Sequence, residues 1–79
     1  MNRTEIMNIV KKSIKTETEF EGLIEESMSA SDIEGWDSLA HVRIMFRIDH
    51  HLGTQIELTS TYATKTIGDL IDLFVNVMG

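Results

Sequence analysis

Residues 35–53 read GWDSLAHVRIMFRIDHHLG, and the pattern of this segment is the strongest structural signal in the chain. Its apolar residues recur at spacings of three and four, which predicts an amphipathic helix from about Ser38 to Leu52. Asp37 is a good candidate for the N-cap, and Gly53 stands where a glycine commonly ends a helix. The predicted apolar stripe consists of Leu39, Val42, Met45, Phe46 and Leu52, widened by Ile44 and Ile48. A charge at Val42 is therefore expected to destabilise the fold strongly.

Two further segments show helical periodicity. The first runs from about Thr4 to Ile14, and Thr4 is its expected cap. The second runs from about Ile67 to Met78, where Thr66 and Asp69 resemble a capping box with Asp in place of the usual Glu or Gln. No segment shows a convincing strand pattern.

A long connection, from about Lys15 to Trp36, separates the first two helices. Such a loop is unusual in a small domain and is often functional. Apolar residues along it are expected to pin it onto the core: Phe20, Leu23, Ile24, Met28, Ile33 and Trp36. One short helical turn is expected around Ser60 to Ala63, anchored by Tyr62. The predicted fold is all-α, a small four-helix bundle with three long helices and one short one.

The composition limits the classes of function that the chain can have. The chain has 79 residues, which indicates one domain spanning residues 1–79, and no cysteine for disulfides or thiolate metal sites. Its net charge of -6 argues against nucleic acid as a partner and suits the basic surfaces of other proteins. No apolar run approaches the ~20 residues of a membrane span, and the N-terminus lacks the continuous apolar segment of a signal peptide. We therefore expect a cytoplasmic protein.

The segment Gly35-Trp36-Asp37-Ser38-Leu39-Ala40-His41-Val42 resembles the prosthetic-group site of acyl carrier proteins. The hallmark of that family is Asp-Ser-Leu at the start of the second helix, after a long first loop. The resemblance extends to the apolar spacing of the second helix, to the aliphatic Ile56 and to the opening of the last helix, Thr66 to Leu70. It covers nearly the whole chain at the length usual for the family.

The resemblance implies a covalent cofactor, and it implies that the cofactor, not the chain, supplies the reactive group. A separate phosphopantetheinyl transferase would move 4′-phosphopantetheine from coenzyme A to the hydroxyl of Ser38. The acyl group would then be carried as a thioester on the thiol of the cofactor, so the chain itself would have no catalytic residue and would not be an enzyme. A serine in the first turn of a helix lies near unpaired backbone N–H groups, which favour an attached anion by roughly 0.3–1 kcal/mol.

The resemblance also implies partners and cargo. The expected partners are the transferase and the acyl-loading and acyl-transfer enzymes of fatty-acid, polyketide or related specialised biosynthesis, and the carrier is expected to be a monomer. The expected docking residues around Ser38 are Trp36, Asp37, Leu39, Arg43, Phe46 and Arg47, with Leu39 and Phe46 partly exposed. Trp36 has an alternative role as a loop anchor, and capping alone also accounts for Asp37. The soft side chains of Met7, Met28, Met45 and Met78 either fill the core or adapt to an acyl chain between the helices.

The second helix departs from the family in its charge. Carriers of fatty-acid synthesis usually have an acidic second helix, whereas this helix carries Arg43 and Arg47, has Ala40 at another commonly acidic position, and has only one acidic residue, Asp49. This difference predicts a specialised carrier with a dedicated partner. In the alternative interpretation, the arginines pair with acids of the chain itself, such as Asp49 or Glu34.

Other functions are weaker candidates. An aminoacyl or peptidyl carrier shares the fold and the cofactor, and an unmodified interaction module shares the fold alone. Asp37, Ser38 and His41 include the residue types of a hydrolase triad but lack the G-x-S-x-G turn. His41, His50 and His51 are expected to be surface histidines, and no metal site is expected. The acidic residues Glu17, Glu19, Glu21, Glu25 and Glu26 are expected to form a solvated loop.

Overall fold

The computed structural model describes residues 1–79 and confirms the all-α class. The elements in chain order are α1 (Arg3–Thr18), the 3-10 turn η1 (Ala30–Asp32), α2 (Ser38–Leu52), α3 (Leu58–Thr61) and α4 (Ile67–Met78). Three of the four α-helices are long, and the chain forms no strand. None of the helices is both long and apolar enough to cross a membrane.

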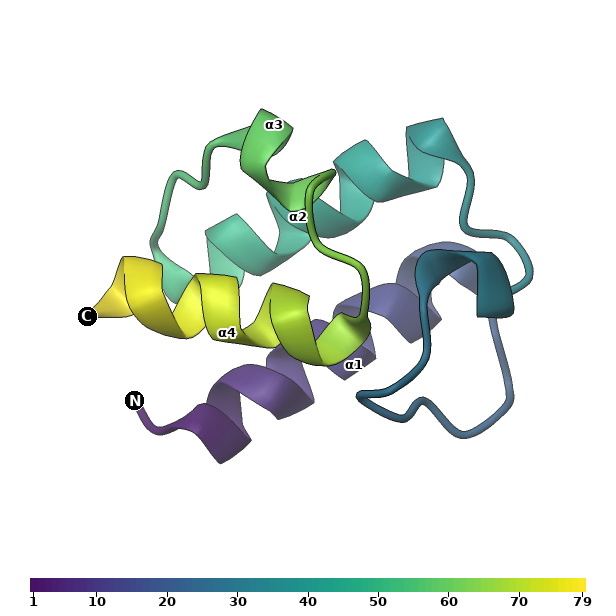
Figure 1. Cartoon of the computed structure of the whole chain (residues 1–79), viewed down its shortest axis with the longest axis horizontal. Helices are drawn as coiled ribbons and strands as arrows, with labels where there is room; N and C mark the ends of the chain where they lie inside the picture. The colour runs from purple at the N-terminus through teal and green to yellow at the C-terminus, as the bar shows by residue number, and fades with distance from the viewer.

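The three long helices lie alongside one another. In Figure 1, α1 runs from left to right, and α2 and α4 run back, so that the two termini lie at the same end of the molecule. The first loop and η1 lie at the opposite end, next to the start of α2. Helix α1 contacts both α2 and α4. This arrangement places the start of α2 at the end of the bundle that the long loop covers.

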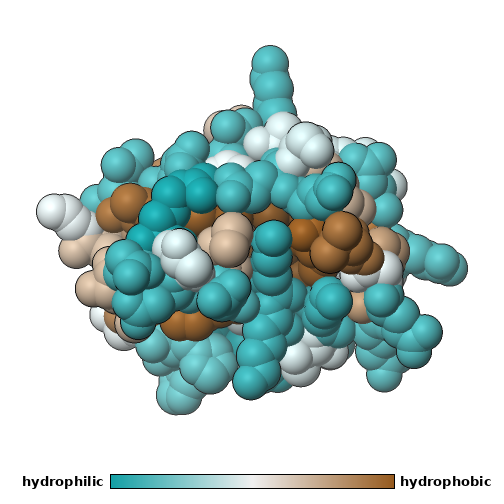
Figure 2. Space-filling model, turned by 90° about the horizontal axis from the view of Figure 1, so that it is seen from below, coloured by the Kyte–Doolittle hydropathy of each residue, from teal (hydrophilic) through white to brown (hydrophobic).

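The core is one cluster of thirteen buried apolar residues. Helix α1 contributes three of them and the first loop contributes two, while α2 and α4 supply the remainder. The members are Ile6, Val10, Ile14, Ile24, Ile33, Ile44, Met45, Ile48, Leu52, Ile67, Leu70, Ile71 and Phe74. Most of the outer surface seen from below is hydrophilic, with apolar residues visible in separate patches (Figure 2).

Helix α2 begins and ends where the sequence predicts. The carboxylate of Asp37 accepts a hydrogen bond from the backbone N–H of Ala40 at 2.8 Å. Gly53 ends the helix with a φ of 68°, in the left-handed region that favours glycine, and its N–H donates to the carbonyl of Asp49. The N-cap and the C-terminal glycine of α2 are therefore both confirmed.

The buried face of α2 differs from the predicted stripe. Leu39 and Phe46 are 58% and 64% exposed, and Val42 is half-buried and lies outside the core cluster. Four residues of the predicted stripe are buried as expected, and two residues beside them, Ala40 and His41, are buried as well. The four confirmed residues are Ile44, Met45, Ile48 and Leu52. Apolar residues occur on two adjacent faces of this helix, and contact with the rest of the bundle determines which face is buried. The expected exposure of Leu39 and Phe46 is confirmed.

Helix α1 is longer than expected, and its cap is a different residue. The side chain of Asn2, not Thr4, accepts from the N–H of Glu5 at 2.9 Å, and the carboxylate of Glu5 accepts from the N–H of Asn2. The helix continues for one more turn, to Thr18, and ends at Glu19 in the left-handed conformation. The extra turn is polar on its exposed side, so the apolar pattern does not reveal it.

The first loop is attached to the start of α4 by backbone hydrogen bonds. The N–H of Ile67 donates to the carbonyl of Met28 at 2.8 Å, and the N–H of Gly68 donates to the carbonyl of Glu26 at 2.9 Å. A Cβ atom at Gly68 would lie only 3.2 Å from the Cβ of Glu26, so glycine permits this close approach. The loop residues expected to reach the core do pack against it or within it, except Leu23, which is 75% exposed.

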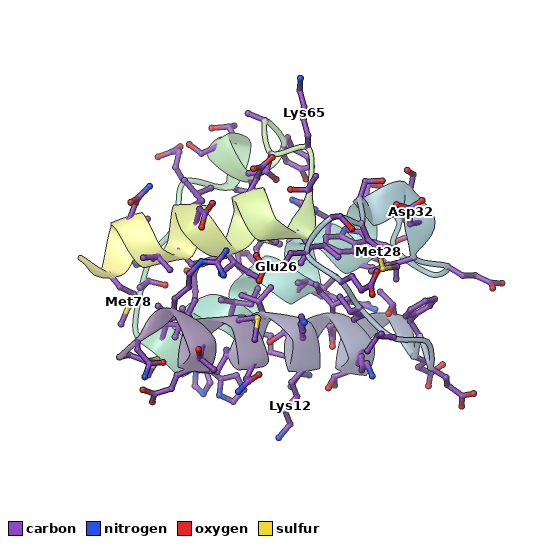
Figure 3. All side chains as sticks on the ribbon, turned by 60° about the horizontal axis from the view of Figure 1, so that its bottom comes forward. Lys12, Glu26, Met28, Asp32, Lys65 and Met78 are labelled. Atoms are coloured by element: carbon purple, nitrogen blue, oxygen red, sulfur yellow. The ribbon has the colours of Figure 1, made fainter.

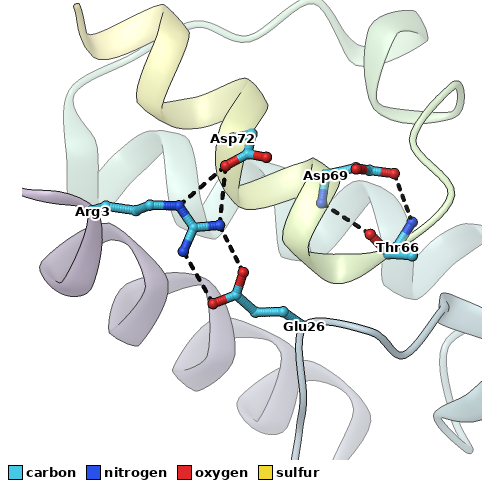
Figure 4. Close-up of polar contacts among 5 residues, drawn as sticks. All are labelled: Arg3, Glu26, Thr66, Asp69 and Asp72. Atoms are coloured by element: carbon cyan, nitrogen blue, oxygen red, sulfur yellow. Dashed lines mark hydrogen bonds and ion pairs between the residues drawn. The ribbon is translucent and has the colours of Figure 1, made fainter.

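An exposed cluster of charges joins α1, the first loop and the middle of α4. The guanidinium of Arg3 donates to both carboxylate oxygens of Glu26, at 2.7 and 3.0 Å, and to Asp72 (Figure 4). These hydrogen bonds raise the pKa of Arg3 and lower that of Glu26. The predicted capping box of Thr66 and Asp69 is confirmed in the same view.

The short helix α3 lies close to its predicted position, but its anchor is different. Tyr62 is 55% exposed, whereas the preceding Thr61 is buried. The hydroxyl of Thr61 donates to the carbonyl of Leu58 at 2.6 Å and contacts the ring of His41. Thr61 therefore attaches α3 to α2, and Tyr62 covers the attachment from outside.

Candidate functional site

Ser38 is the first residue of α2 and is exposed. Its hydroxyl forms no hydrogen bond within the chain. The chain reaches it through a turn at Gly35, which has a φ of 91° and lies so close to α1 that an added Cβ would be 2.8 Å from the carbonyl oxygen of Thr18. A side chain at position 35 would strain the left-handed backbone and would clash with the carbonyl oxygen of Thr18. The turn that leads to Ser38 therefore depends on glycine.

Some backbone N–H groups around Ser38 have no hydrogen-bond partner. Asp37 takes two of the first N–H groups of α2: its carboxylate accepts from Ala40, and its carbonyl accepts from His41 at 2.9 Å. The N–H groups of Ser38 and Leu39 have no partner within the helix. Together with the dipole of a helix of 15 residues, they provide a setting that suits a phosphate ester on the oxygen of Ser38. The Asp37 carboxylate opposes that effect and is engaged as the N-cap.

A hydrogen-bonded chain of side chains lies beside Ser38. The indole N–H of Trp36 donates to Nδ1 of His41 at 3.1 Å, and Nε2 of His41 is 2.7 Å from the hydroxyl oxygen of Thr61. Because Nδ1 accepts a hydrogen bond, the proton of the neutral ring lies on Nε2 and is donated to Thr61. Thr61 in turn donates to the carbonyl of Leu58. The chain joins the first loop, α2 and α3.

His41 is thus a buried residue, and its predicted place on the surface is wrong. It is 8% exposed, and the ring of Tyr62 stacks on it with the ring centroids 4.4 Å apart. Burial lowers the pKa of His41, because it disfavours the charged form. Trp36 is half-buried and packs against the core, which favours its role as a loop anchor. Apolar spacing gave no indication of Thr61, since a polar residue enters no hydrophobic pattern.

The arrangement of His41 also bears on the hydrolase triad. Both ring nitrogens of His41 are occupied, by Trp36 and by Thr61, and the carboxylate of Asp37 is occupied as a helix cap. The ring therefore forms no hydrogen bond with the hydroxyl of Ser38. His50 and His51 are exposed, as predicted, and no three metal-ligating side chains come together.

The exposed face of α2 carries the remaining predicted docking residues. Leu39, Arg43 and Phe46 are exposed at successive turns of one helix face. Arg47 forms an ion pair with Glu17 of α1 at 3.1 Å, so the two arginines do not present equal free charges. Glu17 is half-buried and belongs to α1, not to a solvated loop. The proposed alternative of pairing within the chain holds for Arg47, with Glu17 in place of Asp49 or Glu34.

The four methionines singled out in the sequence do not share a cavity. Met45 is fully buried in the core, whereas Met7 and Met28 are half-buried against it. Met78 is 37% exposed. Figure 3 shows Met28 and Met78 at opposite ends of the molecule. Their positions favour the interpretation that they fill separate gaps in and around the core.

Comparisons with known proteins identify no relative of this chain. No protein-family model matches the chain, and neither a curated protein nor a solved structure does so. The resemblance to carrier proteins therefore depends on the Asp-Ser-Leu motif and the helix pattern around it.

Proposed function

We propose that the chain is an acyl carrier protein in which the hydroxyl of Ser38 receives a 4′-phosphopantetheine arm from coenzyme A. The observation that carries this proposal is the state of Ser38: an exposed, unbonded hydroxyl at the first position of a long helix, with unpaired backbone N–H groups beside it. Bound there, the arm would supply the thiol that holds the acyl group as a thioester.

The residues around Ser38 have separate parts in this proposal. Gly35 gives the chain its turn, so that the transferase can reach the hydroxyl. Asp37 fixes the start of the helix and holds Ser38 in its first turn. Ser38 and Leu39 offer N–H groups to the phosphate of the arm. Trp36 holds the end of the loop in place through His41. No side chain of the site acts on the acyl group, so the chain would be a substrate of enzymes and not an enzyme.

The proposal includes a cytoplasmic, monomeric carrier whose partners dock at the start of α2. Leu39 and Phe46 offer apolar contact there, because both are more than half exposed. An aminoacyl or peptidyl carrier and an unmodified module remain as outcomes of the tests. The partner enzymes would belong to fatty-acid, polyketide or related specialised biosynthesis.

Modification of Ser38 is the direct test. After incubation with coenzyme A and a broad-specificity phosphopantetheinyl transferase, the intact mass is expected to rise by one phosphopantetheine group. Ser38→Ala is expected to abolish the gain without unfolding the protein, because the hydroxyl makes no hydrogen bond. Ser27→Ala, which removes another exposed serine, is the matched control and is expected to be modified like the parent.

Peptide mapping then locates the group. A parent protein that gains no mass under these conditions would support the unmodified module. Phosphopantetheine found on Ser27, Ser29, Ser31 or Ser60 would contradict the assignment of Ser38.

Arg43 is expected to set partner choice through its charge. It is exposed and forms no ion pair, whereas Arg47 is paired with Glu17. Enzymes that serve acidic carriers present basic residues to this helix, so Arg43→Glu is expected to speed association with a standard fatty-acid synthase enzyme several-fold at low salt. The measurement is the rate of acyl transfer across a range of salt concentrations.

The single variant is cleaner than a double one, because Arg47→Glu would place a second carboxylate beside Glu17. Arg43→Gln removes the charge without reversing it and is expected to give an intermediate rate. Equal rates for the parent and both variants at every salt concentration would show that the charge of Arg43 does not determine the partner.

A further inference from the structure

A hollow on the surface of α1 is lined by all three lysines of that helix. Lys11, Lys12 and Lys15 border it together with Thr16, and the first loop borders it with residues 23 and 24. In Figure 3, Lys12 extends from α1 away from α4. The hollow shares no residue with the one beside Arg43 and Phe46 on α2. We call this separate surface the lysine hollow.

The positive charges of the lysine hollow are not neutralised within the chain. Arg3 and Arg47 form ion pairs with carboxylates, whereas none of the three lysines does so. No acidic residue stands three or four positions from Lys11 or Lys12 on α1. Lys15 stands at those spacings instead, where like charges repel each other. Three of the seven basic side chains of an acidic protein are thus held together without a counter-charge.

The loop side of the lysine hollow exposes an apolar residue. Leu23 is 75% exposed, more than any other large apolar side chain, while the next residue, Ile24, is 1% exposed and belongs to the core. Ile24 therefore fixes the loop against the bundle at the point where Leu23 faces solvent. An apolar contact bordered by charged side chains is an arrangement typical of protein–protein interfaces.

The charges around the lysine hollow restrict the shape of its partner. Glu21 and Glu25 stand two residues on either side of Leu23, and both are exposed. They would repel a broad anionic surface such as a lipid bilayer, whose binding usually takes about four to eight basic residues. A single acidic segment of a protein can contact the lysines without covering the glutamates.

We propose that the lysine hollow is a second docking site, which binds an acidic segment of a partner protein. Lys11, Lys12 and Lys15 face the carboxylates of that segment, and Leu23 contacts one of its apolar side chains. The site includes neither Ser38 nor the exposed residues of α2, so it does not depend on the carrier function.

The test uses a synthetic peptide rich in glutamate around a leucine, and a counterpart with glutamine in place of every glutamate. Each peptide is titrated into the full chain, and the backbone N–H chemical shifts are followed. The glutamate peptide is expected to give saturable shifts at residues 11–16 and 23–24, with a Kd that rises several-fold with salt. The glutamine peptide is expected to give none.

Variants of the lining residues assign the binding. The triple variant Lys11→Gln, Lys12→Gln, Lys15→Gln is expected to raise the Kd about tenfold. Leu23→Ser is expected to raise it less. Lys65→Gln removes an exposed lysine outside the hollow, so it is the matched control and is expected to bind like the parent. None of these side chains forms a hydrogen bond within the chain, and the helical circular dichroism signal checks that each variant folds.

Several results would overturn the proposal. These are no saturable binding at millimolar peptide, shifts centred on Arg43 and Phe46, or equal affinities for the parent and the triple variant. Vesicles of anionic phospholipid that sediment with the parent but not with the triple variant, when the peptide binds neither, would assign the hollow to membranes instead.

The carrier function is tested separately in the same variants. The triple variant is expected to gain phosphopantetheine on Ser38 like the parent, while it loses affinity for the peptide. A parent that binds the peptide but gains no mass would contradict only the carrier function. A triple variant that loses both properties would show that the lysines belong to the docking surface of the transferase, and would overturn the second site.

Discussion

An Ile44→Asp variant is expected to lose a large part, or all, of the free energy of unfolding of the parent. Ile44 has no exposed surface and belongs to the core cluster. An unpaired carboxylate at such a position costs about 4–5 kcal/mol or more, whereas a domain of 79 residues has a total stability of about 4–12 kcal/mol. Urea unfolding followed by the helical circular dichroism signal measures the loss.

Val42→Asp is the matched control, because it puts the same charge two residues away on the same helix. Val42 is half-buried and outside the core, so its carboxylate can reach water and the loss is expected to be much smaller. The strong destabilisation that the sequence predicts for a charge at Val42 is therefore expected at Ile44 instead. Equal unfolding midpoints for Ile44→Asp and the parent would contradict the buried face assigned to α2.

The contrast between these two residues shows how far the sequence predicts the fold. The ends of α2 and the start of α4 follow from local chemistry: Asp37, Gly53 and Thr66 act on backbone groups within a few residues of themselves. Local signals of this kind can be read from one sequence. The end of α1 at Thr18 has no comparable apolar signal, so the helix predicted from the sequence ends one turn before the observed one.

The buried face of α2 is a different kind of problem. Two adjacent stripes of this helix are apolar, and periodicity alone does not distinguish the one that meets α1 from the one that meets solvent. Helical periodicity predicts that Val42 is in the core because it lies within one of these stripes. The structure buries the stripe of Ile44, and the tertiary contacts, not the helix itself, determine that outcome.

The candidate site also combines local features, which the sequence reveals, with distant contacts, which it does not. Ser38 and its cap can be read from the sequence because their motif is contiguous. The role of His41 cannot be read from the sequence, because its partners, Trp36 and Thr61, lie five and twenty residues away in the chain. A polar residue that is buried through distant hydrogen bonds looks like a surface residue until the fold brings its partners together.

Acidification from pH 7 to pH 5 is expected to destabilise the protein through His41. The neutral ring accepts from Trp36 at Nδ1, and a protonated ring has no acceptor there. Burial lowers the pKa of His41 below 6.5 in the folded protein, while the unfolded chain takes up the proton at about 6.5. Between these two pKa values the unfolded state binds more protons, so the free energy of unfolding falls as the pH falls, by at most about 1.4 kcal/mol per pH unit.

His41→Gln and His50→Gln variants test whether His41 causes this loss of stability at acidic pH. Urea unfolding of the parent is expected to show full stability above about pH 6.5 and a decline below it, whereas His41→Gln is expected to be less stable at pH 7 and to lose most of the decline. The exposed His50 supplies the control, because His50→Gln leaves the Trp36–His41–Thr61 chain intact. Glu26, whose pKa is lowered by its hydrogen bonds with Arg3, stabilises the fold above its unfolded value near 4.5, and that contribution is lost only at more acidic pH. The range between pH 5 and pH 6.5 therefore isolates His41, and a decline of equal slope in the parent and in His41→Gln would show that another group causes it.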